Sequence, residues 1–259
     1  MASRIEAAFK RLKKDGRKAF IPYVMAGDPS LERTEELVLL LERCGADVVE
    51  LGVPFTDPLA DGPVIQAAAQ RAIAAGVTLR GVLAFVRGLR EKTRVPIVLM
   101  TYYNPVFKYG VEAFCRDASE AGVDGLIVPD LPPEEAGELV GPARAHGVDT
   151  IFLLAPTSTP DRIKAVAKAS RGFIYYVSIT GITGAELRLD PAAREAIEAV
   201  RRAARRPVAV GFGVSRPEEA RAVAEMADGV IVGSAIVKRA ALGDAALEDF
   251  LKSLRKAVG

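Results

Sequence analysis

The chain has 259 residues, and half of them are hydrophobic, which is enough for a sizeable core in one large domain or two small ones. The net charge is only +2, from 35 basic and 33 acidic residues, which argues against a nucleic-acid or anionic membrane partner. A single histidine excludes a histidine-rich metal site, and two cysteines without a CxxC motif are typical of buried thiols in a reduced cytosolic protein.

The first segment, Met1–Lys14, is expected to form an amphipathic helix with Ile5, Phe9 and Leu12 on one face. It contains Glu6 and lacks the apolar region of a signal peptide. No later stretch approaches the length of a transmembrane span. The sequence therefore predicts a soluble, cytoplasmic protein.

Eight short apolar runs rich in β-branched residues follow, separated by segments with helical periodicity. The expected strands are Phe20–Val24, Val48–Leu51, Pro96–Thr101, Gly125–Val128, Thr150–Leu154, Phe173–Val177, Val208–Gly211 and Gly229–Val232. The expected helices include Leu31–Arg43, Glu134–Ala145, Arg162–Ala169, Pro191–Ala204 and Pro217–Met226. Eight strand–helix units favour an α/β fold, a (β/α)8 TIM barrel with an additional N-terminal helix, as a single domain over residues 1–259. A doubly wound open sheet is the alternative, but no GxGxxG turn follows an early strand.

A weak repeat supports the barrel. Gly45-Ala46-Asp47, Gly122-Val123-Asp124 and Gly147-Val148-Asp149 each precede an expected strand, and Ala227-Asp228 does so without the glycine. Each glycine is expected to end a helix in a left-handed conformation. The repeat is interpreted as a packing device, and His146 is expected to cap a helix end. Cys44 and Cys115 are both expected inside helices.

The most informative run places a carboxylate at the end of an apolar strand and a second one eleven residues further on, across a loop stiffened by prolines. It reads Glu50-Leu51-Gly52-Val53-Pro54-Phe55-Thr56-Asp57-Pro58-Leu59-Ala60-Asp61-Gly62. A charge in a buried strand is costly unless it is paired or functional, and two carboxylates joined by one loop suit acid/base chemistry. Alternatively, Glu50 pairs with a buried arginine, and Asp57 and Asp61 only cap turns. The run alone leaves both interpretations open.

Glycines follow the last two expected strands, in Gly211-Phe212-Gly213 and Gly233-Ser234. Glycine lets backbone N–H groups approach an anion, and a short helix beginning near Ser234 adds its positive end, so these turns predict a phosphate site. No strand end carries a lysine, which argues against Schiff-base chemistry. The absence of a carboxylate cluster argues against a catalytic metal. The residues therefore favour proton transfer on a phosphorylated substrate with an aromatic or apolar part.

The run from Glu50 to Gly62 closely resembles a signature of the tryptophan synthase α subunit family, and the resemblance extends over essentially the whole chain. Its other motifs are Phe20-Ile21-Pro22-Tyr23, Gly27-Asp28-Pro29, Met100-Thr101-Tyr102-Tyr103-Asn104-Pro105, Asp130-Leu131-Pro132, Thr180-Gly181-Ile182-Thr183-Gly184, Gly211-Phe212-Gly213-Val214-Ser215 and Gly233-Ser234-Ala235. The resemblance implies a lyase that cleaves indole-3-glycerol phosphate to indole and glyceraldehyde 3-phosphate in tryptophan biosynthesis.

The resemblance also implies roles for single residues. Glu50 would be the general acid/base, and Asp61 would accept the indole N–H and stabilise the developing positive charge. Tyr175 would lie near Glu50 and the substrate, and Thr183 would belong to a loop that closes over the substrate and contacts Asp61. The implied indole-pocket walls are Tyr23, Met100, Tyr102, Ile127 and Leu153, and the implied phosphate site is Gly184, Phe212, Gly213, Gly233 and Ser234. Two positions depart from the family pattern: Tyr23 stands where phenylalanine is common, and Glu186 where many members carry arginine.

The family works with a β subunit that carries pyridoxal phosphate, in an αββα complex, so the resemblance implies this partner and no cofactor in the present chain. The matching interface positions are Pro54, Asp57, Asn104, Phe107 and Pro132, all expected on loops at the barrel mouth. Two other functions are alternatives to the lyase that the resemblance implies. One is a different phosphate-binding barrel enzyme, of the sugar-phosphate isomerase or indoleglycerol-phosphate synthase type. The other is a non-catalytic subunit that activates a partner.

Overall fold

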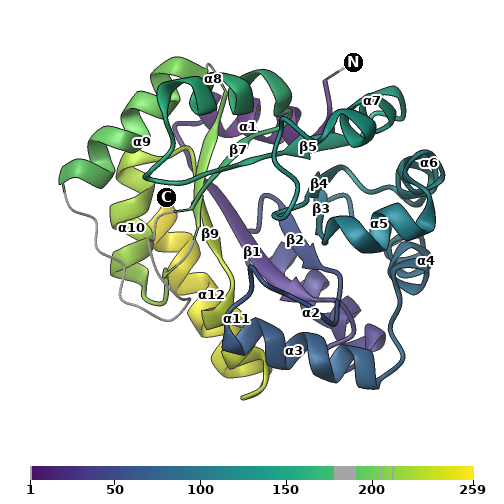
Figure 1. The fold of residues 1–259 in the computed structure, drawn as a ribbon. Helices are drawn as coiled ribbons and strands as arrows, with labels where there is room; N and C mark the ends of the chain where they lie inside the picture. Colours follow the sequence, from purple (N-terminus) through teal and green to yellow (C-terminus); the bar gives the residue numbers. More distant parts are fainter. Residues whose placement is uncertain (1, 178–190, 205, 212) are drawn as a thin grey trace.

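The strands of the chain form one parallel sheet that curves into a nearly closed barrel with helices on its outside (Figure 1). The computed structural model describes residues 2–177, 191–204, 206–211 and 213–259. The strands are β1 (Ala19–Met25), β2 (Val49–Gly52), β3 (Ile97–Met100), β4 (Gly125–Ile127), β5 (Asp149–Ile151), β6 (Leu153–Leu154), β7 (Ile174–Val177), β8 (Val208–Gly211) and β9 (Gly229–Val232). Their order is β5-β4-β3-β2-β1-β9-β8-β7-β6, and every pair is parallel. This confirms the predicted (β/α)8 architecture.

The barrel closes at Phe152. This residue separates β5, which pairs with β4, from β6, which pairs with β7. The sequence predicts one strand over Thr150–Leu154, whereas the structure divides it, because neighbouring strands bond to opposite sides of this short segment. The eight predicted strands are therefore nine segments, and the two ends of the sheet meet at one residue.

Helices separate the strands along most of the chain. They are α1 (Arg4–Lys14), α2 (Leu31–Arg43), α3 (Pro63–Ala74), α4 (Leu79–Leu89), α5 (Tyr103–Tyr109), α6 (Val111–Ala121), α7 (Gly137–Ala145), α8 (Pro160–Ala169), α9 (Pro191–Ala204), α10 (Pro217–Met226), α11 (Ser234–Ala240) and α12 (Asp244–Val258). The bounds of α2, α9 and α10 match the prediction. Cys115 lies inside α6, but Cys44 is the C-cap of α2 rather than a residue within it, and His146 caps α7 as expected.

The inside of the barrel is apolar, and α1 closes it at the N-terminal ends of the strands. Alternate residues of each strand point inward, as the pleat requires. Ile21 of β1, Val98 of β3 and Ile231 of β9 pack there with Phe9 of α1. Ser3 caps α1 by accepting a hydrogen bond from the Glu6 N–H. The predicted apolar face of the N-terminal helix therefore closes the N-terminal end of the barrel, which is called the floor below.

The repeated aspartates lie at the N-terminal ends of the strands and tie neighbouring strands together. The carboxylate of Asp47 accepts the N–H of Phe20 at 3.0 Å, and that of Asp124 accepts the N–H of Ile97 at 2.8 Å. Arginines pair with these aspartates and with the two other members of the repeat, in the ion pairs Arg255–Asp47, Arg90–Asp124, Arg171–Asp149 and Arg201–Asp228. The glycines at 45, 122 and 147 have positive φ, as predicted. The repeat is thus a ring of partnered carboxylates around the floor.

No single helix in the described part of the chain is long and apolar enough to cross a membrane, although α3 and α4, bent by 91° at their junction, meet the length and composition criteria as a pair.

Candidate active site

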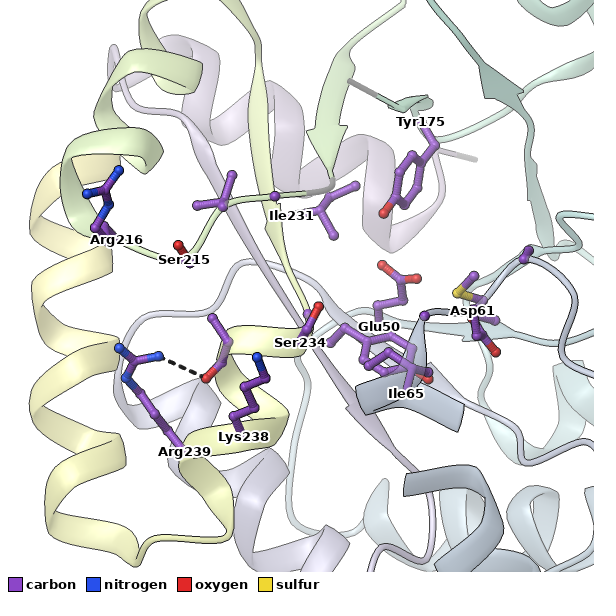
Figure 2. A pocket seen from close by; sticks show the side chains of 18 residues that line it. Glu50, Asp61, Ile65, Tyr175, Ser215, Arg216, Ile231, Ser234, Lys238 and Arg239 are labelled. Carbon is purple, nitrogen blue, oxygen red and sulfur yellow. Dashed lines mark hydrogen bonds between the residues drawn. The ribbon is translucent and has the colours of Figure 1, made fainter. Parts of the chain in front are cut away.

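A cavity of about 390 Å³ opens at the C-terminal ends of the strands (Figure 2). Its inner wall is formed by inward-pointing strand residues, and the loops after β2, β8 and β9, together with residues of α3 and α11, supply the rest. The lining residues are Tyr23, Glu50, Ala60, Asp61, Gly62, Ile65, Met100, Tyr175, Gly213, Val214, Ser215, Arg216, Ile231, Gly233, Ser234, Ala235, Lys238 and Arg239. Parallel β/α barrels carry their active sites at this end of the sheet.

Glu50 is buried in the cavity wall without a charged partner. It lies in the middle of β2, in register with Tyr23 of β1 and Val98 of β3, and is 1% exposed. Its Oε2 atom has no hydrogen-bond partner, and no arginine or lysine of the described residues forms an ion pair with it. The described residues therefore give no support to the interpretation of Glu50 as the partner of a buried arginine. Burial, reinforced by the charge of Asp61, raises the pKa of Glu50 to about 8.

Asp61 reaches the same cavity from the loop between β2 and α3. Burial raises the pKa of Asp61 to about 6, and the hydrogen bond from the Tyr102 hydroxyl opposes this rise. Tyr102 also accepts the N–H of Ala60 at 3.0 Å, and its ring packs on Phe55 at a centroid distance of 5.3 Å. Tyr102 therefore holds the loop that carries Asp61. Asp57, by contrast, is exposed, and its carboxylate accepts the Thr56 hydroxyl at 2.7 Å.

The two carboxyl groups differ in charge near neutral pH. With a pKa of about 8 for Glu50 and about 6 for Asp61, the pair holds one proton between these values, and it resides on Glu50. A neutral acid beside an ionised carboxylate can donate a proton and stabilise a cation in the same cavity. The sequence places both carboxylates at this end of the barrel, and the structure gives them different surroundings.

Two tyrosines complete the wall beside Glu50. Burial and the nearby carboxylates raise the pKa values of Tyr23 and Tyr175 well above their usual range, so both phenols stay neutral. In Figure 2 the Tyr175 hydroxyl faces the Glu50 carboxyl across the cavity. A Cβ atom at Gly52 would lie 2.0 Å from the Tyr23 hydroxyl, and one at Gly211 would lie 2.3 Å from the Tyr175 hydroxyl. Gly52 and Gly211 therefore make room for the tyrosines.

The other end of the cavity is cationic and rich in glycine. Gly213, with φ 79°, lies there with Gly233 and Ser234. Four polar residues that line this end were not predicted from the sequence: Ser215, Arg216, Lys238 and Arg239. Lys238 follows Ser234 by four residues, which places both on one face of α11, and Figure 2 shows them at the same end of the cavity. This helical spacing was the signal available in the sequence.

The cations at this end differ in how far they are engaged. Arg216 pairs with Glu219 at 2.7 Å, and Arg239 donates to the Ala235 carbonyl at 3.2 Å while its guanidinium covers the Phe250 ring. Lys238 is exposed and has no ion pair within the described ranges. Lys238 is therefore the cation best able to receive an anion at this end of the cavity.

The remaining predicted site residues fall into two groups. Met100 lines the cavity, whereas Ile127 is fully buried and Leu153 packs beside it in the apolar barrel interior, outside the lining residues. Thr183, Gly184, Phe212 and Glu186 lie outside the described residues. Within the described ranges, no group of three or more histidine, cysteine, aspartate or glutamate side chains could hold a metal ion.

The predicted partner positions lie around the cavity rim with different exposure. Asp57, Asn104 and Phe107 are exposed, Pro132 is half-buried, and Pro54 is buried within the chain. Asn104 and Phe107 belong to the short helix α5, which corrects the expectation that all five lie on loops. Phe107 is 61% exposed and Leu59, on the Asp61 loop, is 94% exposed, so large apolar side chains face outward at this rim.

Comparisons with known proteins agree over the whole chain. Residues 9–257 match the family model of the tryptophan synthase alpha chain. The tryptophan synthase alpha chain of Geobacter sulfurreducens is 52% identical, with 99% of each chain covered, and that of a Picosynechococcus species is 50% identical, with 98% of each covered. A solved structure of Mycobacterium tuberculosis tryptophan synthase aligns with a TM-score of 0.93 at 41% identity, covering 100% of this chain and 99% of that one. An alpha subunit structure from Legionella pneumophila gives a TM-score of 0.91 at 38% identity.

Proposed function

Because the chain belongs to the tryptophan synthase alpha chain family, we propose that it cleaves indole-3-glycerol phosphate to indole and D-glyceraldehyde 3-phosphate. This aldol-type cleavage is a step of tryptophan biosynthesis. The observation that carries the proposal is the buried carboxyl of Glu50, whose Oε2 atom has no hydrogen-bond partner among the described residues, beside the carboxyl of Asp61 in one cavity.

Glu50 moves the proton in this proposal. Its protonated carboxyl donates to C3 of the indole ring, and the resulting carboxylate accepts the proton of the glycerol hydroxyl next to the bond that breaks. The bond between C3 and the glycerol carbon then breaks, its electrons restore the indole ring, and the hydroxyl carbon becomes an aldehyde. The proton lost from the hydroxyl regenerates the acid, so no other proton donor is required.

Asp61 stabilises the charge that this proton transfer creates. Protonation at C3 places positive charge on the ring nitrogen, and a carboxylate that accepts the N–H lowers the energy of that cation. Asp61 suits the task because it is ionised at neutral pH and Tyr102 holds its loop. Tyr23, Met100 and Tyr175 would flank the indole ring, with Ile127 and Leu153 behind them.

The glycine-rich end of the cavity is the proposed phosphate site. Gly213, Gly233 and Ser234 offer backbone N–H groups and a hydroxyl, and Lys238 adds a charge. Gly184 and Phe212 are assigned to this site, and Thr183 to contact with Asp61, by the resemblance alone. The chain is proposed to act as one domain over residues 1–259.

The proposed partner is a tryptophan synthase β chain, which holds pyridoxal phosphate in an αββα assembly. The exposed side chains of Phe107 and Leu59 at the rim support an interface there, since large apolar side chains of this kind mark interaction surfaces. Both alternative functions are disfavoured by family membership, and a non-catalytic role is further disfavoured by the intact carboxyl pair.

Indole release from indole-3-glycerol phosphate tests the proposal, measured for the parent chain and Glu50→Gln, each with and without a β chain from a relative. The parent is expected to release indole, faster with the β chain, and Glu50→Gln is expected to lose the activity in both states. Unchanged turnover in Glu50→Gln would remove Glu50 from the mechanism. No release by the parent even with the β chain would favour the non-catalytic alternative.

A further inference from the structure

A second cleft, of about 980 Å³, lies at the end of the barrel opposite the active-site cavity. Gly172, Pro207 and Asp228 line it, and each immediately precedes a strand or lies within two residues of one, which places the cleft at the N-terminal ends of the strands. Residues of helices α1 and α9 line two of its sides. Nothing in the reaction proposed for the mouth uses this cleft.

The cleft concentrates positive charge. Its lining includes seven cations, Lys10, Lys13, Arg17, Lys18, Arg201, Arg202 and Arg206, against the three carboxylates Glu6, Glu198 and Asp228. The whole chain has a net charge of only +2, so the excess at this cleft is local rather than a reflection of composition. A concave surface lined by charge of one sign focuses the field and attracts counter-ions.

All three carboxylates of the cleft are engaged by the arginines of α9 and the turn after it. Arg201 forms a two-pronged pair with Asp228 at 2.7 and 3.1 Å. Arg202 lies 3.4 Å from Glu198, and Arg206 lies 3.9 Å from Glu6. The acids on this face therefore neutralise the arginines.

The lysines of α1 and of the turn that follows it are not neutralised. Lys10, Lys13 and Lys18 form no ion pair with any residue in the described ranges, and Arg17 donates only to the Gly259 carbonyl, at 3.4 Å. Lys10 and Lys13 lie about 4.5 Å apart along the helix axis on one face. Lys18 lies beyond the turn at Gly16 and lines the same cleft. This cation row therefore combines charges from α1 and from the segment that follows it.

Lys18 is the most constrained member of this row. It is half-buried at the entry to β1, and burial lowers the pKa of its ammonium group. Asp228 opposes that shift, but its two carboxylate oxygens are already bonded to Arg201. A half-desolvated ammonium without an ion pair is unfavourable, and a bound anion would compensate it.

We propose that this cleft is a binding site for an oligophosphate anion, held by Lys10, Lys13, Arg17 and Lys18. A chain of linked phosphates carries several charges and can contact cations of α1 and of the following segment at the same time, whereas a single phosphate reaches fewer of them. The ligand is either an inorganic polyphosphate or the phosphate chain of a nucleotide, since both present the same chemistry to the lysines.

Isothermal titration of the full chain with sodium tripolyphosphate, a nucleoside triphosphate and orthophosphate tests this proposal. Tripolyphosphate is expected to bind one-to-one and at least about tenfold more tightly than orthophosphate, because charge-assisted contacts are each worth about a factor of ten. Equal affinity for the nucleoside triphosphate would show that the phosphate chain alone is recognised, and tighter binding would identify the nucleotide as the ligand.

Three lysine variants locate the site. Lys18→Gln and Lys13→Gln are each expected to weaken tripolyphosphate binding about tenfold. Lys14→Gln removes the same charge from the same helix, but Lys14 does not line the cleft, so it is expected to change the affinity less than twofold. Because Lys13 is an exposed helix residue, its variant keeps the test valid if Lys18→Gln fails to fold.

The proposal is overturned if tripolyphosphate does not bind, if Lys14→Gln weakens binding as much as Lys13→Gln, or if glyceraldehyde 3-phosphate displaces it. The second result would indicate diffuse attraction to a basic face, and the third would place the anion in the cavity at the mouth. Indole release is expected to be unchanged in Lys13→Gln, which separates this site from the proposed reaction.

Discussion

The two ends of this barrel treat their buried carboxylates in opposite ways. At the floor, Asp47 and Asp124 each accept a backbone N–H from a neighbouring strand and pair with an arginine. At the mouth, Glu50 is as deeply buried, yet one of its oxygens has no partner. The difference indicates that a buried carboxyl is structural where backbone N–H groups and arginines bind it. Where such partners are absent among the described residues, the carboxyl is available for chemistry.

Asp149 at the floor and Glu50 at the mouth show the same contrast in the groups that influence their pKa values. Burial raises the pKa of both carboxyls. At Asp149 the Ser3 hydroxyl and the Arg171 guanidinium oppose the rise, whereas at Glu50 the only further influence, the charge of Asp61, adds to it. Burial alone therefore does not identify the catalytic group, and the missing counter-charge does.

The largest expected effect is the loss of catalysis in Glu50→Gln. The amide keeps the shape of the side chain but cannot donate a proton to carbon, so kcat for indole release is expected to fall about a thousandfold. Thermal unfolding is expected to stay at or above that of the parent, since a buried unpartnered carboxyl is removed. A fall in kcat of less than tenfold would make Glu50 a structural residue like the floor aspartates.

The opposite result is expected at the floor, for Asp124→Ala. This change leaves Arg90 buried without its counter-charge and frees the Ile97 N–H, so the protein is expected to lose about 3 kcal/mol of unfolding free energy in urea. The folded fraction should keep a kcat within about twofold of the parent, because the floor is remote from the mouth. As a matched control, Asp57→Ala removes an exposed carboxylate and should cost less than about 0.5 kcal/mol.

Asp61→Asn compares the contributions of the two carboxyl groups at the mouth. The amide cannot balance the positive charge on the indole ring, so kcat is expected to fall about a hundredfold, less than in Glu50→Gln. Single-turnover kinetics separate this loss from weaker binding. Equal losses in Asp61→Asn and Glu50→Gln would contradict the division of roles between the two carboxyls.

The pH profile of kcat/KM reports the same division. Activity requires protonated Glu50 and ionised Asp61, so it should fall as the pH rises through about 8 and as it drops through about 6. Beyond each limit the fall should approach about tenfold per pH unit. A profile that rises steadily from pH 6 to 9 would mean that the active form of Glu50 is ionised.

The smallest effect is expected at the phosphate end, from Lys238→Gln. Loss of one cation should raise KM for indole-3-glycerol phosphate about tenfold, with kcat nearly unchanged, because the contact acts equally on substrate and transition state. Lys256→Gln, an exposed lysine of α12 outside the cavity, is the control and should change neither constant. An unchanged KM in Lys238→Gln would leave the phosphate to the backbone N–H groups and Ser234.

Sequence patterns predicted most of the fold and the two carboxyl groups that line one cavity. Apolar runs, three of them preceded by Gly-x-Asp turns, predicted the strands, and a charge inside one such run singled out Glu50. The division of the fifth strand at Phe152 was missed, because the pairing partners of a strand are set by barrel closure and not by its own residues.

The side chains of the site were harder to assign. The residues at the strand ends do not predict Lys238, because this lysine reaches the cavity from the first turn and a half of α11. Tyr102 was assigned to the pocket wall, but its contacts with Ala60 and Asp61 depend on how a loop folds back, which local patterns do not encode.

The central claim is that Glu50 lacks a compensating partner and therefore keeps its proton near neutral pH. A 13C NMR titration of the carboxyl groups, with the Glu50 resonance assigned by its loss in Glu50→Gln, measures this directly. The titration midpoint of Glu50 is expected at a pKa of about 8, and a midpoint at its ordinary value of 4.5 would contradict the account.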